Sequence, residues 1–297
     1  MSRLNELRRG ASMWPLLGAA LTLSLANAAA SEPVAAQARQ FCLRGQVAEP
    51  IAFHGALNYD KAGGAAGAML YPAPGIVGML AAVATHAAIN GGVRESERQK
   101  MREEADKVLL PYQPALENYK LLELMQASLG EMKTAGSKRV VAAATACAEG
   151  EVAADVVPSF FMTQDQRALI LESAISIRSE GAKPYEKIIR VISPAQDHNA
   201  GVATWFNARE NMLRKASARM FAQSLDIALA DARTVAEPSD PFKTVRYNEG
   251  GAERMERAQV VSDECGQLVL RTLRGNLIAV PRKGVEATNA ACPPAQL

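Results

Sequence analysis

Four cysteines carry the clearest chemistry in this sequence, because a pair of cysteines can oxidise to a cross-link that stabilises the fold. They are Cys42, Cys147, Cys265 and Cys292. No two of them form a C-x-x-C pair, so their spacing supports neither a redox motif nor a zinc site. Three pairings are open. Because two cysteines lie in the main body and two in a short C-terminal segment, we favour Cys42–Cys147 and Cys265–Cys292.

The three histidines are the next candidates for proton transfer or metal binding. His54 falls in an expected strand, His86 in a Gly/Ala-rich helix and His198 in a polar loop. Asp197 and Asn199 flank His198, but no second ligand lies at a useful spacing. We interpret each histidine as structural or solvated, and we expect no metal site.

The sequence contains no H-E-x-x-H, no G-x-S-x-G and no phosphate-binding loop. We therefore expect no catalytic residue and no cofactor, and we interpret the chain as a protein that is not an enzyme. In the C-terminal segment, Arg271, Arg274 and Arg282 could form a basic rim for an acidic partner, but a solvated hairpin face is the favoured interpretation.

Residues 1–30 have the pattern of an export signal. They begin with basic side chains, continue with an apolar run from Met13 to Leu25 and end in small residues. We expect cleavage between Ala28 and Ser31, and hence a periplasmic or secreted protein. Disulfides persist in such oxidising compartments, which strengthens the interpretation of the cysteines.

The charge balance argues against nucleic acid as a partner. The chain has 33 basic and 31 acidic residues, and residues 1–30 hold three arginines and one glutamate. Without that segment, 30 residues of each sign remain. Because there is no positive surplus to neutralise phosphates, we expect no nucleic-acid binding.

Alternating apolar residues predict a hairpin in the middle of the chain. Residues 168–178 place Leu169, Leu171, Ser173, Ile175 and Ile177 on one face, and residues 185–192 continue after a polar turn. Residues 207–233 then predict a long helix with one apolar stripe. Further strands are expected near residues 46–60 and 138–147, with two helices between them broken near Pro111 and Pro114. These elements predict an α+β fold, in which helices pack on a mixed sheet, for a main domain of residues 31–235.

The C-terminal part is expected to be a separate, small all-β module. Residues 236–253 resemble a linker in their Pro, Gly and charge content. Residues 254–297 predict a hairpin whose turn uses Gly275 and Asn276 for positive φ. A module this small needs a cross-link such as Cys265–Cys292.

Residues 74–92 are uncharged and rich in Gly and Ala. They predict a helix with one small-residue face, which carries Gly78, Ala81, Ala82 and Thr85 and could form an interface with a close neighbour or a second copy. With six large apolar residues beside a histidine and an asparagine, a buried or interface helix is favoured over a membrane span. Membrane association is therefore not favoured.

The order of these elements over residues 46–233 is similar to that in a group of uncharacterised bacterial envelope proteins. Many members are described as lipoproteins with a small α/β domain. The likeness rests on the Gly/Ala helix "GIVGMLAAVATHAAINGG", the strands "ALILESAISIRS" and "YEKIIRVISP", and the helix "ENMLRKASARMFAQSLDIALADA". This chain lacks the lipid-attachment cysteine of the group and adds a cysteine-bearing tail. The resemblance implies an envelope location and no activity.

Two functions follow as hypotheses. The favoured one is a non-catalytic exported cell-envelope protein, an accessory or assembly factor that binds another envelope protein or forms a homodimer. The alternative is a cell-wall-directed hydrolase or glycan-binding protein whose site is not recognisable in the sequence.

Overall fold

The computed structural model describes residues 40–57, 92–179, 183–196, 205, 212–234, 240–264 and 266–282, which all belong to one unit, Ala38–Leu297. The strands are β1 (Phe41–Gly45), β2 (Ala52–Gly55), β3 (Lys138–Ala142), β4 (Val152–Met162), β5 (Leu169–Arg178), β6 (Tyr185–Ile192), β7 (Lys243–Glu249), β8 (Ala252–Glu264), β9 (Gln267–Thr272) and β10 (Leu277–Pro281). The helices are α2 (Gly92–Asp106), the 3₁₀ helix η1 (Lys107–Tyr112), α3 (Gln113–Leu116), α4 (Leu121–Glu131) and α6 (Met212–Arg233).

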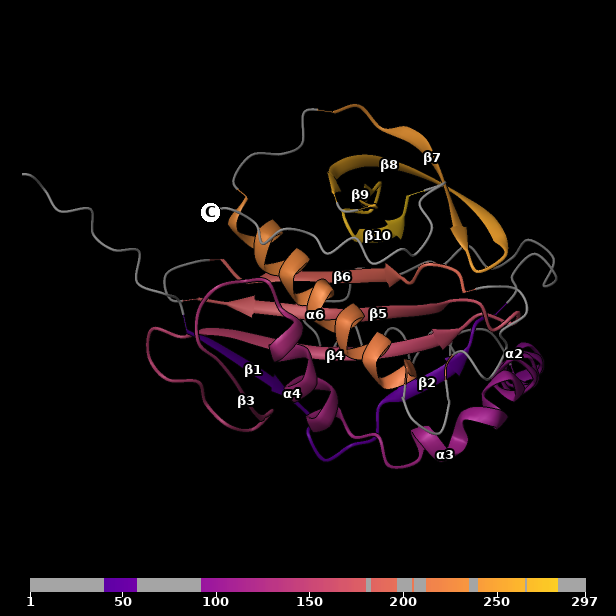
Figure 1. The fold of residues 1–297 in the computed structure, drawn as a ribbon, viewed down its shortest axis with the longest axis horizontal. Helices are drawn as coiled ribbons and strands as arrows, with labels where there is room; N and C mark the ends of the chain where they lie inside the picture. Colours follow the sequence, from indigo (N-terminus) through magenta and orange to yellow (C-terminus); the bar gives the residue numbers. More distant parts are fainter. Residues whose placement is uncertain are drawn as a thin grey trace, which may run out of the picture. The chain divides into compact units, whose positions relative to one another are not determined.

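These strands form one mixed ten-stranded sheet in the order β3-β1-β4-β5-β6-β10-β9-β8-β7, with β2 also paired to β4 (Figure 1). The strands β3, β1 and β4 run parallel to one another, β4–β5–β6 form antiparallel pairs, and β10 lies parallel to β6. The predicted α+β fold, with helices packed on a mixed sheet, is confirmed. The predicted hairpin is β5–β6, and the helices between β2 and β3 do break around Pro111 and Pro114.

One face of the sheet is apolar and is covered by α6 and α4 (Figure 1). Alternate residues of β4, from Val152 to Met162, point into this core, as do the five predicted positions of β5. The helix α6 supplies the predicted stripe, including Leu213, Phe221 and Leu225, which are almost fully buried. Each such side chain stabilises the fold by about 1.5–3 kcal/mol relative to an exposed one, so the core accounts for the position of α6 on the sheet.

The strand β4 has two partners along one of its edges. Its first half pairs with β1 and its second half with β2, which leaves Pro158 in the break between them. Because neither β1 nor β2 pairs with β4 at this position, the missing N–H group of proline costs no hydrogen bond to these two strands. The connecting residues leave the sheet to bind the start of α4, where the N–H groups of Leu121 and Leu122 donate to the carbonyls of Glu49 and Val47. The residues that connect β1 and β2 thus supply acceptors for backbone N–H groups at the N-terminus of α4.

The segment expected to be a linker, residues 236–253, contains β7 and the first residues of β8, so that part of the expectation is wrong. Val245, Tyr247 and Glu249 alternate with exposed neighbours and are buried, which is the period of a half-buried strand. In the sequence this alternation is hard to recognise, because the buried positions include Glu249 and the segment contains several charged side chains. The hairpin β9–β10 is present, and Gly275 in its turn has a φ of +78°, but Asn276 does not have a positive φ. Through β10 and β6, the hairpin continues the main sheet.

Several expectations fall on residues outside the described ranges. These include the export signal at residues 1–30, the cysteines Cys265 and Cys292, and the helix expected at residues 74–92 apart from Gly92, which is the first residue of α2. None of the helices in the described part combines the length and the hydropathy of a transmembrane segment.

Candidate functional site

The predicted disulfide between Cys42 and Cys147 is present, with an S–S distance of 2.17 Å and Cα atoms 5.8 Å apart. Cys42 is fully buried in β1, and Cys147 lies in the loop between β3 and β4. The bond therefore fastens that loop to the sheet. The second predicted pair, Cys265–Cys292, lies outside the described residues and stays a prediction.

His54 is the one histidine within the described ranges, and it is exposed at the end of β2. Its Nδ1 atom lies 3.8 Å from Oδ2 of Asp106, and its ring contacts Phe161 with centroids 5.7 Å apart. The other carboxylate oxygen of Asp106 accepts a hydrogen bond of 2.7 Å from the Gly55 N–H. A carboxylate behind an imidazole can orient it for proton transfer, but here the carboxylate also anchors the end of β2. His86 and His198 lie outside the described residues.

A tight turn between β4 and β5 joins several distant segments, and sequence reasoning missed it. Its Gln166 has a φ of +57°, which a residue with a side chain rarely adopts. The backbone carbonyl of Gln166 accepts a bond of 2.6 Å from Trp205 Nε1, and its side-chain oxygen accepts one of 2.8 Å from the Tyr112 hydroxyl. Burial raises the pKa of Tyr112 to about 12, so this hydroxyl keeps its proton and remains a donor. These partners hold the turn in its unusual conformation.

The carboxylate in this turn belongs to Asp165. It accepts hydrogen bonds from the Thr163 hydroxyl and from the N–H groups of Arg167 and Gly251. Partial burial alone would raise the pKa of Asp165, but these donors outweigh it and hold the pKa below its usual value. Asp165 therefore stays ionised and connects the β4–β5 turn to the β7–β8 turn, which is a structural role.

The second face of the sheet is divided between a small core and a polar area. The strands β7–β10 bury Ile170 and Ile192 against Val245, Tyr247 and other apolar side chains. Further along β4 and β5, the half-exposed Ala153, Val157 and Ala174 belong to neither hydrophobic core of the described residues. We call the area formed by these three residues and the charged side chains around them the polar face.

Arginine–carboxylate pairs lie on the polar face and beside it. Asp155, which lies between Ala153 and Val157 on the same side of β4, accepts two hydrogen bonds from Arg44, of 2.6 and 2.7 Å, and also contacts Arg178. Beyond Ala174, Arg190 lies 2.7 Å from Glu249 and 3.5 Å from Glu172. Each of these carboxylates is thus occupied by at least one arginine.

The three arginines considered for a basic rim do not share one role. Arg271 is largely buried, and its guanidinium donates to Asp231 of α6 at 2.7 Å. Asp231 also accepts a bond of 3.0 Å from the Tyr185 hydroxyl, and burial together with this carboxylate raises the Tyr185 pKa well above its usual value. Arg282 lies 3.4 Å from Asp263. Arg271 therefore secures α6 to the sheet and is not available to an acidic partner.

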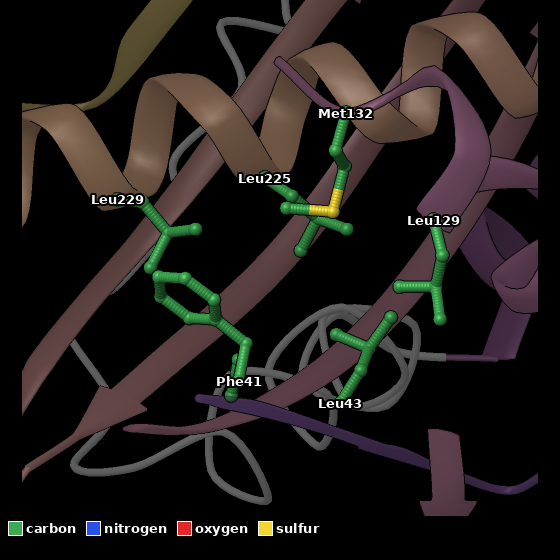
Figure 2. A pocket seen from close by; sticks show the side chains of 7 residues that line it. Phe41, Leu43, Leu129, Met132, Leu225 and Leu229 are labelled. Carbon is green, nitrogen blue, oxygen red and sulfur yellow. The ribbon is translucent and has the colours of Figure 1, made fainter. Parts of the chain in front are cut away.

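A cavity of about 10 Å³ lies between the sheet, α4 and α6 (Figure 2). It is about the size that one water molecule needs. Its lining is entirely apolar: Phe41, Leu43, Leu129, Met132, Ala154, Leu225 and Leu229. A space this small and nonpolar is a packing defect of the core and not a ligand site.

The small-residue face proposed as an interface, with Gly78, Ala81, Ala82 and Thr85, lies outside the described residues. The features that the described residues do bring together are the Cys42–Cys147 bond, the braced β4–β5 turn and the polar face. The residues of the turn and of the polar face are brought together by the sheet topology, which no local sequence pattern reveals. The chain matches no protein-family model, no curated protein and no solved structure.

Proposed function

We propose that this protein is an exported cell-envelope protein that binds another protein as an accessory or assembly factor, and that it is not an enzyme. The Cys42–Cys147 bond supports the export, because structural disulfides persist in oxidising compartments. The signal pattern of residues 1–30 and the resemblance to bacterial envelope proteins point to the same compartment.

The observation that carries the binding role is the composition of the polar face. Protein interfaces combine an apolar centre with a polar, charged rim. Here the partly exposed apolar residues Ala153, Val157 and Ala174 lie among the charged pairs Arg44–Asp155 and Arg190–Glu249. Since these charges neutralise one another, we expect the partner to be recognised by shape and apolar contact more than by net charge.

The carboxylates near this face support a binding role over a catalytic one. Asp155 is held by Arg44 and Arg178, and Glu249 by Arg190. A general acid or base must lie within hydrogen-bond reach of a substrate, whereas the oxygens of these carboxylates already contact arginine side chains.

The test is affinity capture from envelope fractions with a tagged chain. Ala174→Arg places a long charged side chain in the centre of the polar face, and Thr244→Arg places the same side chain on the exposed part of β7. We expect Ala174→Arg to abolish capture of a partner that the unchanged chain and Thr244→Arg both retain. Circular dichroism verifies that both variants are folded.

Two outcomes contradict the proposal. Capture of the same partner by Ala174→Arg would show that the polar face is not the binding surface. Co-sedimentation of the chain with purified cell-wall glycan, lost in Ala174→Arg and kept in Thr244→Arg, would favour the alternative of a glycan-binding protein.

A further inference from the structure

Two sulfurs and a carboxylate meet beside β1. The Sγ atoms of Cys42 and Cys147 and a carboxylate oxygen of Glu151 all lie within 4.8 Å of one another. We propose that these three side chains form a redox-gated metal site, which binds a thiophilic divalent cation such as Zn²⁺ once the disulfide is reduced. The site adjoins the polar face, because Cys42 is paired with Ala153 in the sheet, but it does not depend on the binding function.

Glu151 is held in place for such a role. Its Oε1 accepts a hydrogen bond of 2.7 Å from Arg139 Nε, and its Oε2 accepts bonds of 2.6 Å from the second Arg139 nitrogen and from the Ala148 N–H. A carboxylate offers about four lone-pair sites, so these three bonds leave one, on Oε1. Carboxylates that bind metals are characteristically oriented by hydrogen bonds of this kind.

The two cysteines are positioned by separate elements. Strands β3 and β4 flank Cys42 on both sides and fix its backbone, whereas Cys147 lies in a loop and is only half-buried. Two thiolates and one carboxylate, with water as a fourth ligand, form a donor set that suits tetrahedral Zn²⁺. The three negative charges of this set are neutralised by Arg139 together with a divalent cation.

The chemistry has two steps. A dithiol reductant breaks the S–S bond and becomes a disulfide itself, and its two electrons and two protons convert Cys42 and Cys147 to thiols. Binding of the cation then releases both thiol protons, because the thiolate is the ligand. The loop that holds Cys147 therefore exchanges a covalent cross-link to β1 for a metal-bridged one.

The experiment uses the full chain with Cys265→Ser and Cys292→Ser, so that one cysteine pair remains. After reduction with dithiothreitol and anaerobic desalting, Co²⁺ is titrated and the thiolate-to-cobalt absorption is followed. We expect bands that saturate at one Co²⁺ per chain and disappear when Zn²⁺ is added. The oxidised protein, in which the thiolates are absent, should give none.

A matched pair of variants tests the carboxylate. Glu151→Gln should weaken Co²⁺ binding about tenfold or more, whereas Glu149→Gln, at an exposed position of the same loop, should leave it unchanged. Circular dichroism follows the fold throughout. Recovery of the fold by Zn²⁺ in a reduced chain that has loosened would also support the site.

Three outcomes overturn the proposal. The first is the absence of one-to-one thiolate bands in the reduced chain. The second is equal Co²⁺ affinity of Glu151→Gln and Glu149→Gln, which would remove the carboxylate from the site. The third is unfolding on reduction that Zn²⁺ does not reverse, because the three donors would then no longer be held together.

Discussion

A Cβ atom on Gly55 would lie 1.9 Å from the carbonyl oxygen of Ala105. The end of β2 and the last turn of α2 therefore approach each other more closely than any residue with a side chain allows. The Gly55 N–H also donates to Asp106, next to Ala105, at 2.7 Å. Glycine is required here for this close contact and not for a positive φ.

Gly55→Ala should therefore destabilise the protein by about 1–3 kcal/mol, since the backbone atoms it meets cannot move aside as a side chain would. The measurement is the free energy of unfolding from urea titration. Gly130→Ala is the control, because a Cβ at that position of α4 meets no atom within 4 Å. That change should be neutral or gain up to about 1 kcal/mol from helix propensity. Equal effects at the two positions would refute the close contact.

Ser173 is fully buried in β5, and within the described part of the chain its hydroxyl has no hydrogen-bond partner. Burying an unpaired hydroxyl costs about 1–3 kcal/mol. Ser173→Ala should therefore leave the unfolding free energy unchanged or raise it. Ser217 is equally buried, but its hydroxyl donates to the Leu213 carbonyl at 2.8 Å, so Ser217→Ala should cost about 0.5–1.5 kcal/mol. A larger loss at Ser173 than at Ser217 would mean that the hydroxyl is satisfied after all.

Replacing both Cys42 and Cys147 by alanine should lower the unfolding free energy by about 2–5 kcal/mol, because the bond joins residues 105 apart and restricts the unfolded chain. Thermal and urea unfolding of the double variant measure this loss. Replacing Cys265 and Cys292 in a separate variant measures the contribution of the second predicted pair while the Cys42–Cys147 bond is kept. A double variant as stable as the parent would contradict a structural role for this disulfide.

Acid should weaken the loop that carries Glu151. Hydrogen bonds from Arg139, and then from the Ala148 N–H, lower the pKa of this carboxyl from 4.5 to about 2. A lowered pKa in the folded state means that the contribution is complete above about pH 4.5 and is lost as the pH falls toward 2. We expect Glu151→Gln to flatten the pH dependence of the urea midpoint in this window, whereas Glu149→Gln should not. Parallel curves for Glu151→Gln and the parent would contradict the pairing.

The parts of the fold that the sequence predicts correctly have strong local periodicity. Leu169 and its alternate neighbours in β5, and the stripe through Phe221 in α6, follow their periods because one face of each element is buried. The full length of strand β4 was not predicted, and it contains Pro158, a residue type that argues against a central strand. The sheet tolerates proline at position 158 because this position lies in the break between β1 and β2. That break is visible only once the strands are paired.

The candidate sites were harder to predict than the elements. The Cys42–Cys147 pair followed from sorting cysteines by segment, and it is confirmed. The contact of Asp165 with Gly251 joins residues that are 86 positions apart. In the polar face, Arg44, Asp155 and Arg178 come from three different strands. Such juxtapositions depend on topology, which a single sequence does not reveal through periodicity.

The position of β10 has a consequence for how the chain acquires its fold. Because β10 lies between β6 and β9, the edge of β6 has no partner until residues 277–281 have been synthesised and delivered. Until then the nascent polypeptide presents an open strand, which can pair with other chains and aggregate. Parallel pairing across so long a sequence separation also slows folding. Completion of the sheet on this side of β6 therefore depends on a strand close to the end of the described residues.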